Sequence, residues 1–286
     1  MKRYKEFTIT AEPFNPELIS GLMWELDITG VNEEVNCIKI FADEKSQVEP
    51  DDIKSLLQRL VDEKMLFNFS VEEYYVEDKN WNEEWEKSLN VIEVSDKLVI
   101  KPSFKDYAAK PGQIIITIDP KMSFGTGEHQ TTKLVMQLLE KYVKKDMKML
   151  DVGSGTGVLA IAAVKLGAAS AVAVDNDEWC FGNAKENCEV NSAAANIDVR
   201  LGEIKDIKEN NFDLITANIQ KNILLSISSE IKEKAKPGGI IILSGLLFSD
   251  EEDIMKKYTS LGFQFEEKKS MDEWISMVFK YTGKFS

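Results

Sequence analysis

The clearest chemical pattern lies in residues 149 to 160, Met-Leu-Asp-Val-Gly-Ser-Gly-Thr-Gly-Val-Leu-Ala. An apolar run leads into a turn that contains Gly153, Gly155 and Gly157, and the residues after the turn favour a helix. Glycines allow a tight turn and leave bare backbone that a ligand can approach. We expect the amide groups at the start of the helix to face that ligand.

Two classes of cofactor site use such a turn. Dinucleotide sites need the spacing GxGxxG, but Val158 stands where the last glycine of that pattern would be. Asp151 places a carboxylate before the turn, which would repel a pyrophosphate but suits the ammonium group of a methionine moiety. The spacing D-x-G-x-G-x-G resembles the S-adenosylmethionine motif of class I methyltransferases. We therefore predict that Asp151, Gly153 and Gly155 bind the cofactor.

A second carboxylate follows at the end of the next apolar run, where Asp175 stands 22 residues after Gly153. A carboxylate at the tip of the second strand can accept hydrogen bonds from both ribose hydroxyls of a nucleoside. The alternative role is the N-cap of the helix that begins near Asp177. Because Asp177 can supply that cap, we expect Asp175 to be free for the ribose.

Two further segments combine polar residues in unusual ways. Residues 119 to 132 hold the only histidine of the chain among closely spaced glycines, threonines and a phenylalanine. A loop would explain the glycines and a helix cap would explain Thr131, but neither explains the combination. Residues 216 to 224, Thr-Ala-Asn-Ile-Gln-Lys-Asn-Ile-Leu, end another expected strand, and such strand ends line the crevice where α/β sheets bind ligands.

Together these segments resemble the ribosomal protein L-eleven methyltransferase (PrmA) family. The matching stretches are 122–132, 150–175 and 218–224, with further agreement at 236–239, 243–245 and 273–274. The resemblance covers most of residues 79–286. It implies transfer of a methyl group from S-adenosyl-L-methionine, leaving S-adenosyl-L-homocysteine, to lysine or α-amino nitrogens of a basic large-subunit ribosomal protein.

The resemblance also implies roles for single residues. Thr132 would contact the cofactor, Gly153 would do so through its backbone, and Asp175 would hold the ribose. Asn218 would lie beside the transferred methyl group, while Phe124 and His129 would shape the loop over the cofactor. At Gln220-Lys221-Asn222 the chain departs from the family, because many members have small residues and a proline there.

The expected elements divide the chain into three parts. Residues 1–78 read as a small ferredoxin-like α+β domain of order β-α-β-β-α-β, and residues 79–90 as a charged linker helix that carries Trp81 and Trp85. From 91 to 286, strands alternate with helices as in a doubly wound, Rossmann-like α/β domain, and the last two strands form an antiparallel hairpin at the sheet edge. The expected strands cover 5–9, 31–34, 37–41, 67–76, 114–118, 148–152, 170–174, 198–201, 214–217, 240–243, 263–267 and 274–280, and the expected helices of the first domain cover 15–27 and 50–64.

The net charge of the chain indicates what kind of partner it binds. The net charge is −14, and residues 1–78 hold 8 Lys and Arg against 18 Asp and Glu, which makes that part −10. This balance argues against a broad nucleic-acid surface and favours a basic partner, although acidity alone also keeps proteins soluble. The charged residues at the start of the chain are not followed by the apolar segment that a signal peptide would have. The apolar stretch 240–248 is shorter than the ~20 residues of a membrane helix. The three cysteines form no CxxC pair. We expect a cytoplasmic monomer without a metal site.

Other functions fit the same fold. A methyltransferase of RNA or of a small amine is one alternative, although Asn218 is followed by Ile219-Gln220-Lys221 and not by the Pro-Pro-Tyr typical of base-methylating enzymes. A binding protein without turnover is another alternative. The presence of the expected site residues disfavours it, namely Asp151, Gly153, Asp175 and Asn218. Val158 disfavours an NAD-dependent oxidoreductase.

Overall fold

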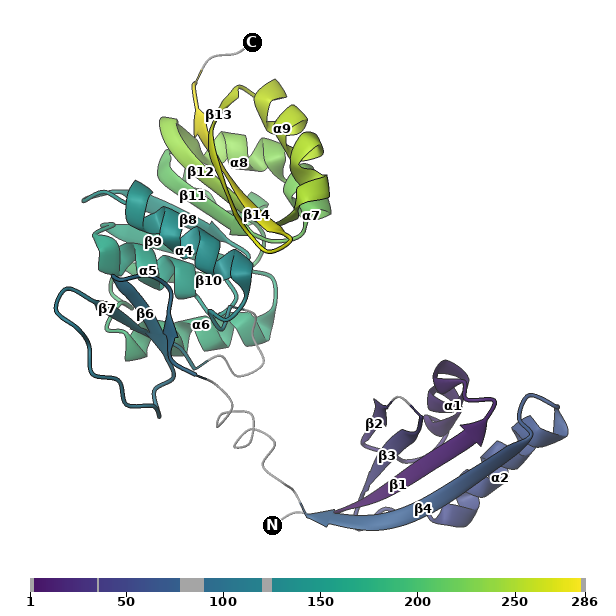
Figure 1. Cartoon of the computed structure of the whole chain (residues 1–286). Coiled ribbons are helices and arrows are strands. Elements are labelled where there is room, and N and C mark those ends of the chain that lie inside the picture. The colour runs from purple at the N-terminus through teal and green to yellow at the C-terminus, as the bar shows by residue number, and fades with distance from the viewer. Residues whose placement is uncertain (1–2, 35, 78–89, 120–124, 284–286) are drawn as a thin grey trace. The chain divides into compact units, whose positions relative to one another are not determined.

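The structure is a computed structural model that describes residues 3–34, 36–77, 90–119 and 125–283. The chain forms two compact units, Met1–Lys87 and Ser88–Ser286. Figure 1 shows the helices and strands of both units. Each unit has its own hydrophobic core. The predicted linker helix with Trp81 and Trp85, and the predicted cofactor residue Phe124, lie outside the described residues.

The first unit has the predicted order of strands and helices. Its sheet has the strand order β2-β3-β1-β4, and every neighbouring pair is antiparallel. Alternate side chains of β1, such as Phe7 and Ile9, are buried beneath the helices together with Ile53 and Leu57 of α2. The elements are β1 (Arg3–Glu12), α1 (Pro16–Met23), β2 (Gly30–Glu33), β3 (Ile38–Asp43), α2 (Pro50–Asp62) and β4 (Asn68–Glu77).

The second unit is built on a seven-stranded sheet of order β10-β9-β8-β11-β12-β14-β13. Its strands are parallel except β14, which is antiparallel to both of its neighbours. The doubly wound fold and the antiparallel edge hairpin are therefore confirmed. The elements that build the sheet and its helices are α4 (Gln130–Tyr142), β8 (Lys148–Val152), α5 (Val158–Leu166), β9 (Ser170–Asp175), α6 (Glu178–Val190), β10 (Ile197–Leu201), η1 (Ile204–Asp206), β11 (Phe212–Asn218), α7 (Lys221–Ser226), α8 (Ser228–Lys234), β12 (Ala235–Leu247), η2 (Phe248–Asp250), α9 (Glu251–Ser260), β13 (Phe263–Met271) and β14 (Trp274–Tyr281).

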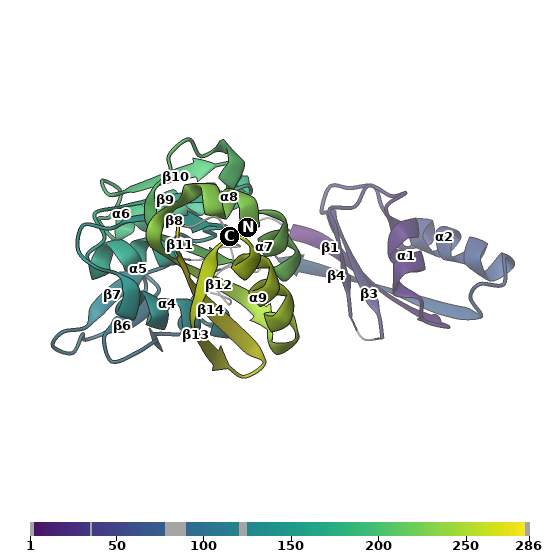
Figure 2. The same cartoon turned by 90° about the horizontal axis from the view of Figure 1, so that it is seen from above.

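Helices cover both faces of this sheet, as Figure 2 shows. Neighbouring strand residues face opposite sides, so Met149 packs with α4 and α5 whereas Leu150 packs with α7, α8 and α9. Burial on both faces explains why the central strands are continuous apolar runs. The helices and the sheet thus hold the strand ends in fixed positions, where the polar residues lie.

A small third sheet was not predicted. The strand expected at 114–118 forms as β7 (Ile114–Thr117), but it pairs with β6 (Leu98–Lys101) and not with the central sheet. β6 also pairs with β5 (Ile92–Glu93), which gives a separate three-stranded sheet. Its apolar side chains join the core around α4 and α5, so tertiary packing decided which sheet β7 entered. Within the described residues, no helix has the length and apolar character to cross a membrane.

Candidate cofactor site

Three of the predicted site residues stand at the same edge of the sheet. β9, β8 and β11 are neighbours and run parallel, so their carboxyl ends meet. Asp175 ends β9, Asn218 ends β11, and Asp151 precedes the end of β8 by one residue. The sheet therefore brings these side chains to the edge where α/β folds bind ligands.

The glycine-rich turn after β8 is held by hydrogen bonds inside the protein. The amides of Gly153 and Ser154 both donate to the carbonyl oxygen of Val174, at 2.9 and 3.1 Å. These two amides precede the start of α5 at Val158, and the neighbouring strand β9 supplies their acceptor. Gly153 has a φ of 70°, and a Cβ there would lie 2.5 Å from Cγ2 of Ile219.

Asp175 is not the N-cap of α6, as expected, but its carboxylate accepts two backbone hydrogen bonds. Its Oδ2 accepts from the amide of Gly155 at 2.8 Å, and its Oδ1 accepts from the amide of Asp177 at 3.1 Å. Asp177 does cap α6, as predicted, by accepting from the amides of Trp179 and Cys180. A carboxylate has about four lone-pair sites, so each oxygen of Asp175 retains capacity for a ribose hydroxyl. The amide of Gly155 therefore donates to the carboxylate of Asp175, and the contact of Gly155 with the cofactor stays a prediction.

Asp151 is fully buried. Its Oδ1 accepts from the hydroxyl of Thr216 at 2.6 Å, whereas its Oδ2 has no hydrogen-bond partner among the described residues. Burial raises the pKa of the Asp151 carboxyl to about 7, opposed by the Thr216 hydrogen bond and reinforced by the negative charge of Asp175. A carboxylate in this position gains strongly from a cationic group placed against Oδ2.

Asn218 and Thr132 meet, although they are 86 residues apart in the chain. The side-chain amide of Asn218 donates to the hydroxyl of Thr132 over 3.5 Å, and the Oδ1 of Asn218 is buried without a partner among the described residues. Thr132 lies in the first turn of α4 and is itself buried. The structure thus brings together two residues that the family resemblance had assigned to the cofactor.

His129 begins α4. Its ring accepts from the amide of Thr131 at 3.3 Å as the N-cap, so Thr131 is not the cap that its position suggested. The His129 ring also packs edge-on against Trp274 of β14, with 4.8 Å between the ring centroids. These contacts support a structural role for His129 at the start of α4.

The polar atoms left over suit an amino acid moiety such as that of S-adenosylmethionine. Asp151 Oδ2, Asn218 Oδ1 and the hydroxyl of Ser154 are buried without hydrogen-bond partners in the part of the chain that the structure describes. Buried polar groups are normally paired, so amino groups of a bound cofactor or substrate, which donate hydrogen bonds, would satisfy the two acceptors Asp151 Oδ2 and Asn218 Oδ1. Sequence reasoning missed Ser154, and its place between two glycines of the turn was the available signal.

Comparison with known proteins identifies the family. The family model for Ribosomal protein L11 methyltransferase (PrmA) matches residues 17–282. The chain belongs to this family. The resemblance stated from the sequence is therefore confirmed, and the match extends through most of the first unit, where the sequence offered little detail.

Individual PrmA relatives agree with this assignment. A ribosomal protein L11 methyltransferase of Acetivibrio thermocellus is 39% identical over 205 residues, which span 72% of this chain and 65% of that protein. One of Desulforapulum autotrophicum is 32% identical over 280 residues and 92% of both chains. The crystal structure of a ribosomal protein L11 methylase from Lactobacillus delbrueckii subsp. bulgaricus has a TM-score of 0.62 and 34% identity, covering 66% of this chain and 97% of that one.

The segment that departs from many PrmA members is anchored in the protein. Lys221 begins α7 and forms ion pairs with Asp250 at 3.0 Å and with Asp253 at 3.2 Å. Because its ammonium group is paired, Lys221 ties the loop after Asn218 to η2 and α9.

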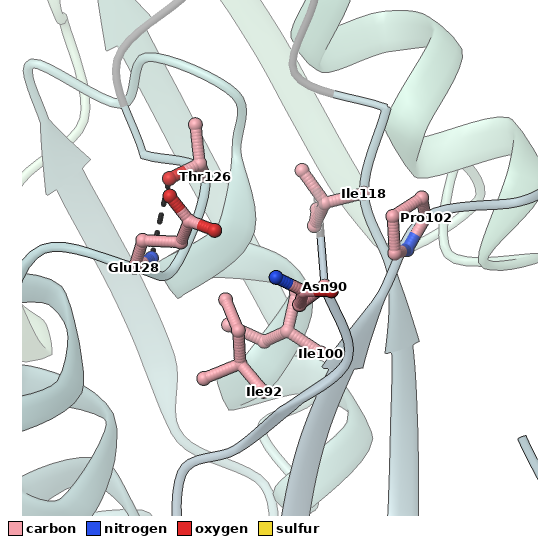
Figure 3. A pocket seen from close by; sticks show the side chains of 7 residues that line it. All are labelled: Asn90, Ile92, Ile100, Pro102, Ile118, Thr126 and Glu128. Carbon is pink, nitrogen blue, oxygen red and sulfur yellow. Dashed lines mark hydrogen bonds between the residues drawn. The ribbon is translucent and has the colours of Figure 1, made fainter. Parts of the chain in front are cut away.

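Two hollows of the second unit are lined by other residues than those of the candidate site. Figure 3 shows a small pocket with four apolar lining residues, in which the hydroxyl of Thr126 accepts from the amide of Glu128 at 3.2 Å. A larger hollow of about 480 Å³ lies at the opposite, amino-terminal ends of β8 and β9, near Lys148 and Ser170. Neither hollow is lined by a predicted cofactor residue. The small pocket is lined by Asn90, Ile92, Ile100, Pro102, Ile118, Thr126 and Glu128.

Proposed function

We propose that the protein transfers methyl groups from S-adenosyl-L-methionine to amino groups of ribosomal protein L11. The observation that carries this proposal is a pair of buried oxygens, Asp151 Oδ2 and Asn218 Oδ1, at the carboxyl ends of β8 and β11 in a chain of the PrmA family. Neither oxygen has a hydrogen-bond partner among the described residues. Asp151 would hold the ammonium group of the cofactor and Asp175 its ribose hydroxyls.

The residues of the chain act by positioning. The bound cofactor supplies an electrophilic methyl group on a sulfonium. The substrate amine attacks only when neutral, and a lysine has a pKa of ~10.4 in water. The Oδ1 of Asn218 can accept a hydrogen bond from the neutral amine, which directs the nitrogen lone pair, and desolvation lowers the amine pKa. His129 is engaged at the start of α4, so we assign it no role as a base.

The first unit supports a basic protein as substrate. Residues 1–78 carry a charge of −10, whereas the remaining 208 residues carry −4. An acidic surface attracts a lysine-rich protein and speeds its encounter with the enzyme. We therefore propose that residues 1–78 recognise the substrate. The linker at 79–90, the cytoplasmic location and the monomeric state stay predictions.

The test is methyl transfer from labelled S-adenosylmethionine to purified ribosomal proteins, RNA and small amines in parallel. Label on L11 is the expected result. Label on RNA or on a small amine alone would keep the cofactor but contradict the substrate. Cofactor binding without transfer to any acceptor would favour a binding protein.

A truncated chain tests the role of the first unit. Each unit has its own core, so deletion of residues 1–78 should leave the second unit folded. We expect the truncated protein to bind the cofactor with unchanged affinity and to lose transfer to L11. Efficient transfer to L11 by the truncated protein would contradict a recognition role for residues 1–78.

A further inference from the structure

Strand β12 contains an irregularity beside the candidate site. Its pairing with β14 shifts register between Leu243 and Leu246, so Ser244 and Gly245 together lie opposite Ser276. Such a bulge places an extra residue in one strand and redirects its side chains. On its other edge, β12 pairs Ser244 with Asn218 of β11, so the bulge adjoins the site.

Ser244 joins three parts of the second unit. Its carbonyl oxygen accepts from the amide of Ile219 at 3.2 Å, immediately after Asn218. Its hydroxyl lies 3.4 Å from the carbonyl oxygen of Thr131, to which it donates, and 2.6 Å from the hydroxyl of Ser276. Either hydroxyl can donate in the contact between Ser244 and Ser276, and when Ser244 donates to Thr131 its one hydrogen is used, so Ser276 is then the donor. Both serines are fully buried, and the chain of hydroxyls ends at the residue before Thr132.

Gly245 makes room for the backbone of Ile219. Its φ is +80°, and a Cβ on Gly245 would lie 2.6 Å from the carbonyl oxygen of Ile219. The side chain of Ile219 in turn fills the space that a Cβ on Gly153 would need. The bulge therefore determines where the chain passes after Asn218 and how closely it approaches the glycine-rich turn.

We propose that Ser244, Gly245 and Ser276 are positioning residues of the methyl-transfer site. The bulge determines the position of Asn218 through the backbone of Ile219. The two serine hydroxyls determine the position of Thr132 through the first turn of α4. The long contact between Asn218 and Thr132 depends on both supports. This inference rests on the proposed function, because it assigns the bulge to the reaction.

Removal of the hydroxyls tests the proposal. Ser244→Ala and Ser276→Ala are compared with Ser228→Ala, which removes an equally buried hydroxyl that bonds to the carbonyl of Leu225 within the helical segment at α7 and α8. We expect kcat to fall about 10-fold in the first two variants, with the cofactor Kd changed less than about threefold. Ser228→Ala should lower the melting temperature comparably and leave kcat unchanged. A kcat within twofold of wild type for Ser244→Ala would overturn the proposal.

Two glycines of the same strand provide a second test. Gly245→Ala and Gly238→Ala both place a side chain at positive φ, +80° and +84°, but the Cβ at Gly238 meets no atom within 4 Å. The difference between the variants therefore isolates the clash with Ile219. We expect kcat to fall about 100-fold in Gly245→Ala and less than about threefold in Gly238→Ala. Equal kcat values in the two variants would overturn the proposal.

Hydrogen exchange separates this inference from the proposed function. Exchange of the Ile219 amide, which is bonded to Ser244, is measured in both glycine variants without any turnover. Faster exchange in Gly245→Ala than in Gly238→Ala is expected, and equal exchange would contradict the support of Ile219 by the bulge. An absence of methyl transfer by the wild-type protein would instead defeat the proposed function, while the exchange measurement still decides whether the bulge sets Ile219.

Discussion

The two sides of the candidate site are held in different ways. On the side of the glycine-rich turn, four backbone amides close onto Val174 and Asp175 with distances between 2.8 and 3.1 Å. On the side of Asn218, a single contact to Thr132 spans 3.5 Å and the Oδ1 of Asn218 has no partner among the described residues. The backbone amides of the first side are satisfied within the protein, whereas on the second side the side chain of Asn218 keeps a buried acceptor for a ligand.

This difference assigns different tasks to the two sides. A turn whose backbone amides already donate hydrogen bonds within the protein offers a rigid shape against which a nucleoside can pack. A buried acceptor without a partner instead gains from a ligand, and its position affects the geometry of the reaction. We therefore expect substitutions on the turn side to change cofactor affinity and those on the Asn218 side to change kcat.

The largest effect is expected for Asp175→Ala. The substitution removes the acceptor of the Gly155 amide and the predicted ribose contacts. Two hydrogen bonds to a charged group are worth about 3 kcal/mol together, so the cofactor Kd should rise about 100-fold. Calorimetric titration with S-adenosylhomocysteine measures it. An unchanged Kd would mean that the turn side does not bind the nucleoside.

Asn218→Ala should act on the other side. Loss of Oδ1 removes the group that orients the amine, so kcat should fall between about 10- and 100-fold. The cofactor Kd should change less than about fivefold, because the turn is intact. Steady-state kinetics with L11 and cofactor titration separate the two quantities. A rise in Kd with unchanged kcat would reverse the assigned tasks.

Asp151→Asn should change the pH dependence of stability. The pKa of Asp151 is about 7 in the fold against 3.8 for the ordinary group, so the unfolded chain loses this proton first as the pH rises. The cofactor-free wild type should thus lose up to about 4 kcal/mol of stability between pH 4 and 7, a loss that the Asp151→Asn variant would avoid. Thermal unfolding at pH 4, 6 and 8 measures the difference, which should be near zero at pH 4 and largest at pH 8. A difference independent of pH would show that Asp151 is ionised at little cost.

The smallest effect is expected for Asp177→Ala, the matched control for Asp175→Ala. Its side chain caps α6 and lies two residues further along the same segment. Loss of an N-cap costs about 1 kcal/mol of stability. The melting temperature should fall slightly while the cofactor Kd stays constant. A large loss of affinity would place Asp177, and not Asp175, against the ligand.

Local patterns carried most of the prediction. Alternating strands and helices indicated the doubly wound domain, and the β-α-β-β-α-β order of the first unit was readable from periodicity. Asp151 and Asp175 could be selected because each stands at or near the end of an apolar run, and parallel strands bring such ends to one edge. The family resemblance added Asn218 and Thr132, and periodicity alone would place Thr132 as an ordinary residue of α4.

The sequence did not show partners that lie far away in the chain. The amides of the glycine-rich turn find their acceptor on β9, and β7 finds its neighbour in β6. A spacing pattern can indicate a turn or a strand, but it does not show which distant acceptor the amides of the turn will find or which strand will pair with it.

The sequence by itself determined the type of fold, the edge of the sheet that carries the site, and the residue types that meet there. Those depend on local periodicity and on the chain order of the strands. Only the tertiary structure decided which atoms of these residues are used internally and which remain for a ligand. That division depends on long-range pairings such as Asn218 with Thr132, and on the bulge at Ser244 and Gly245, whose register is set by the packing of β12 between β11 and β14.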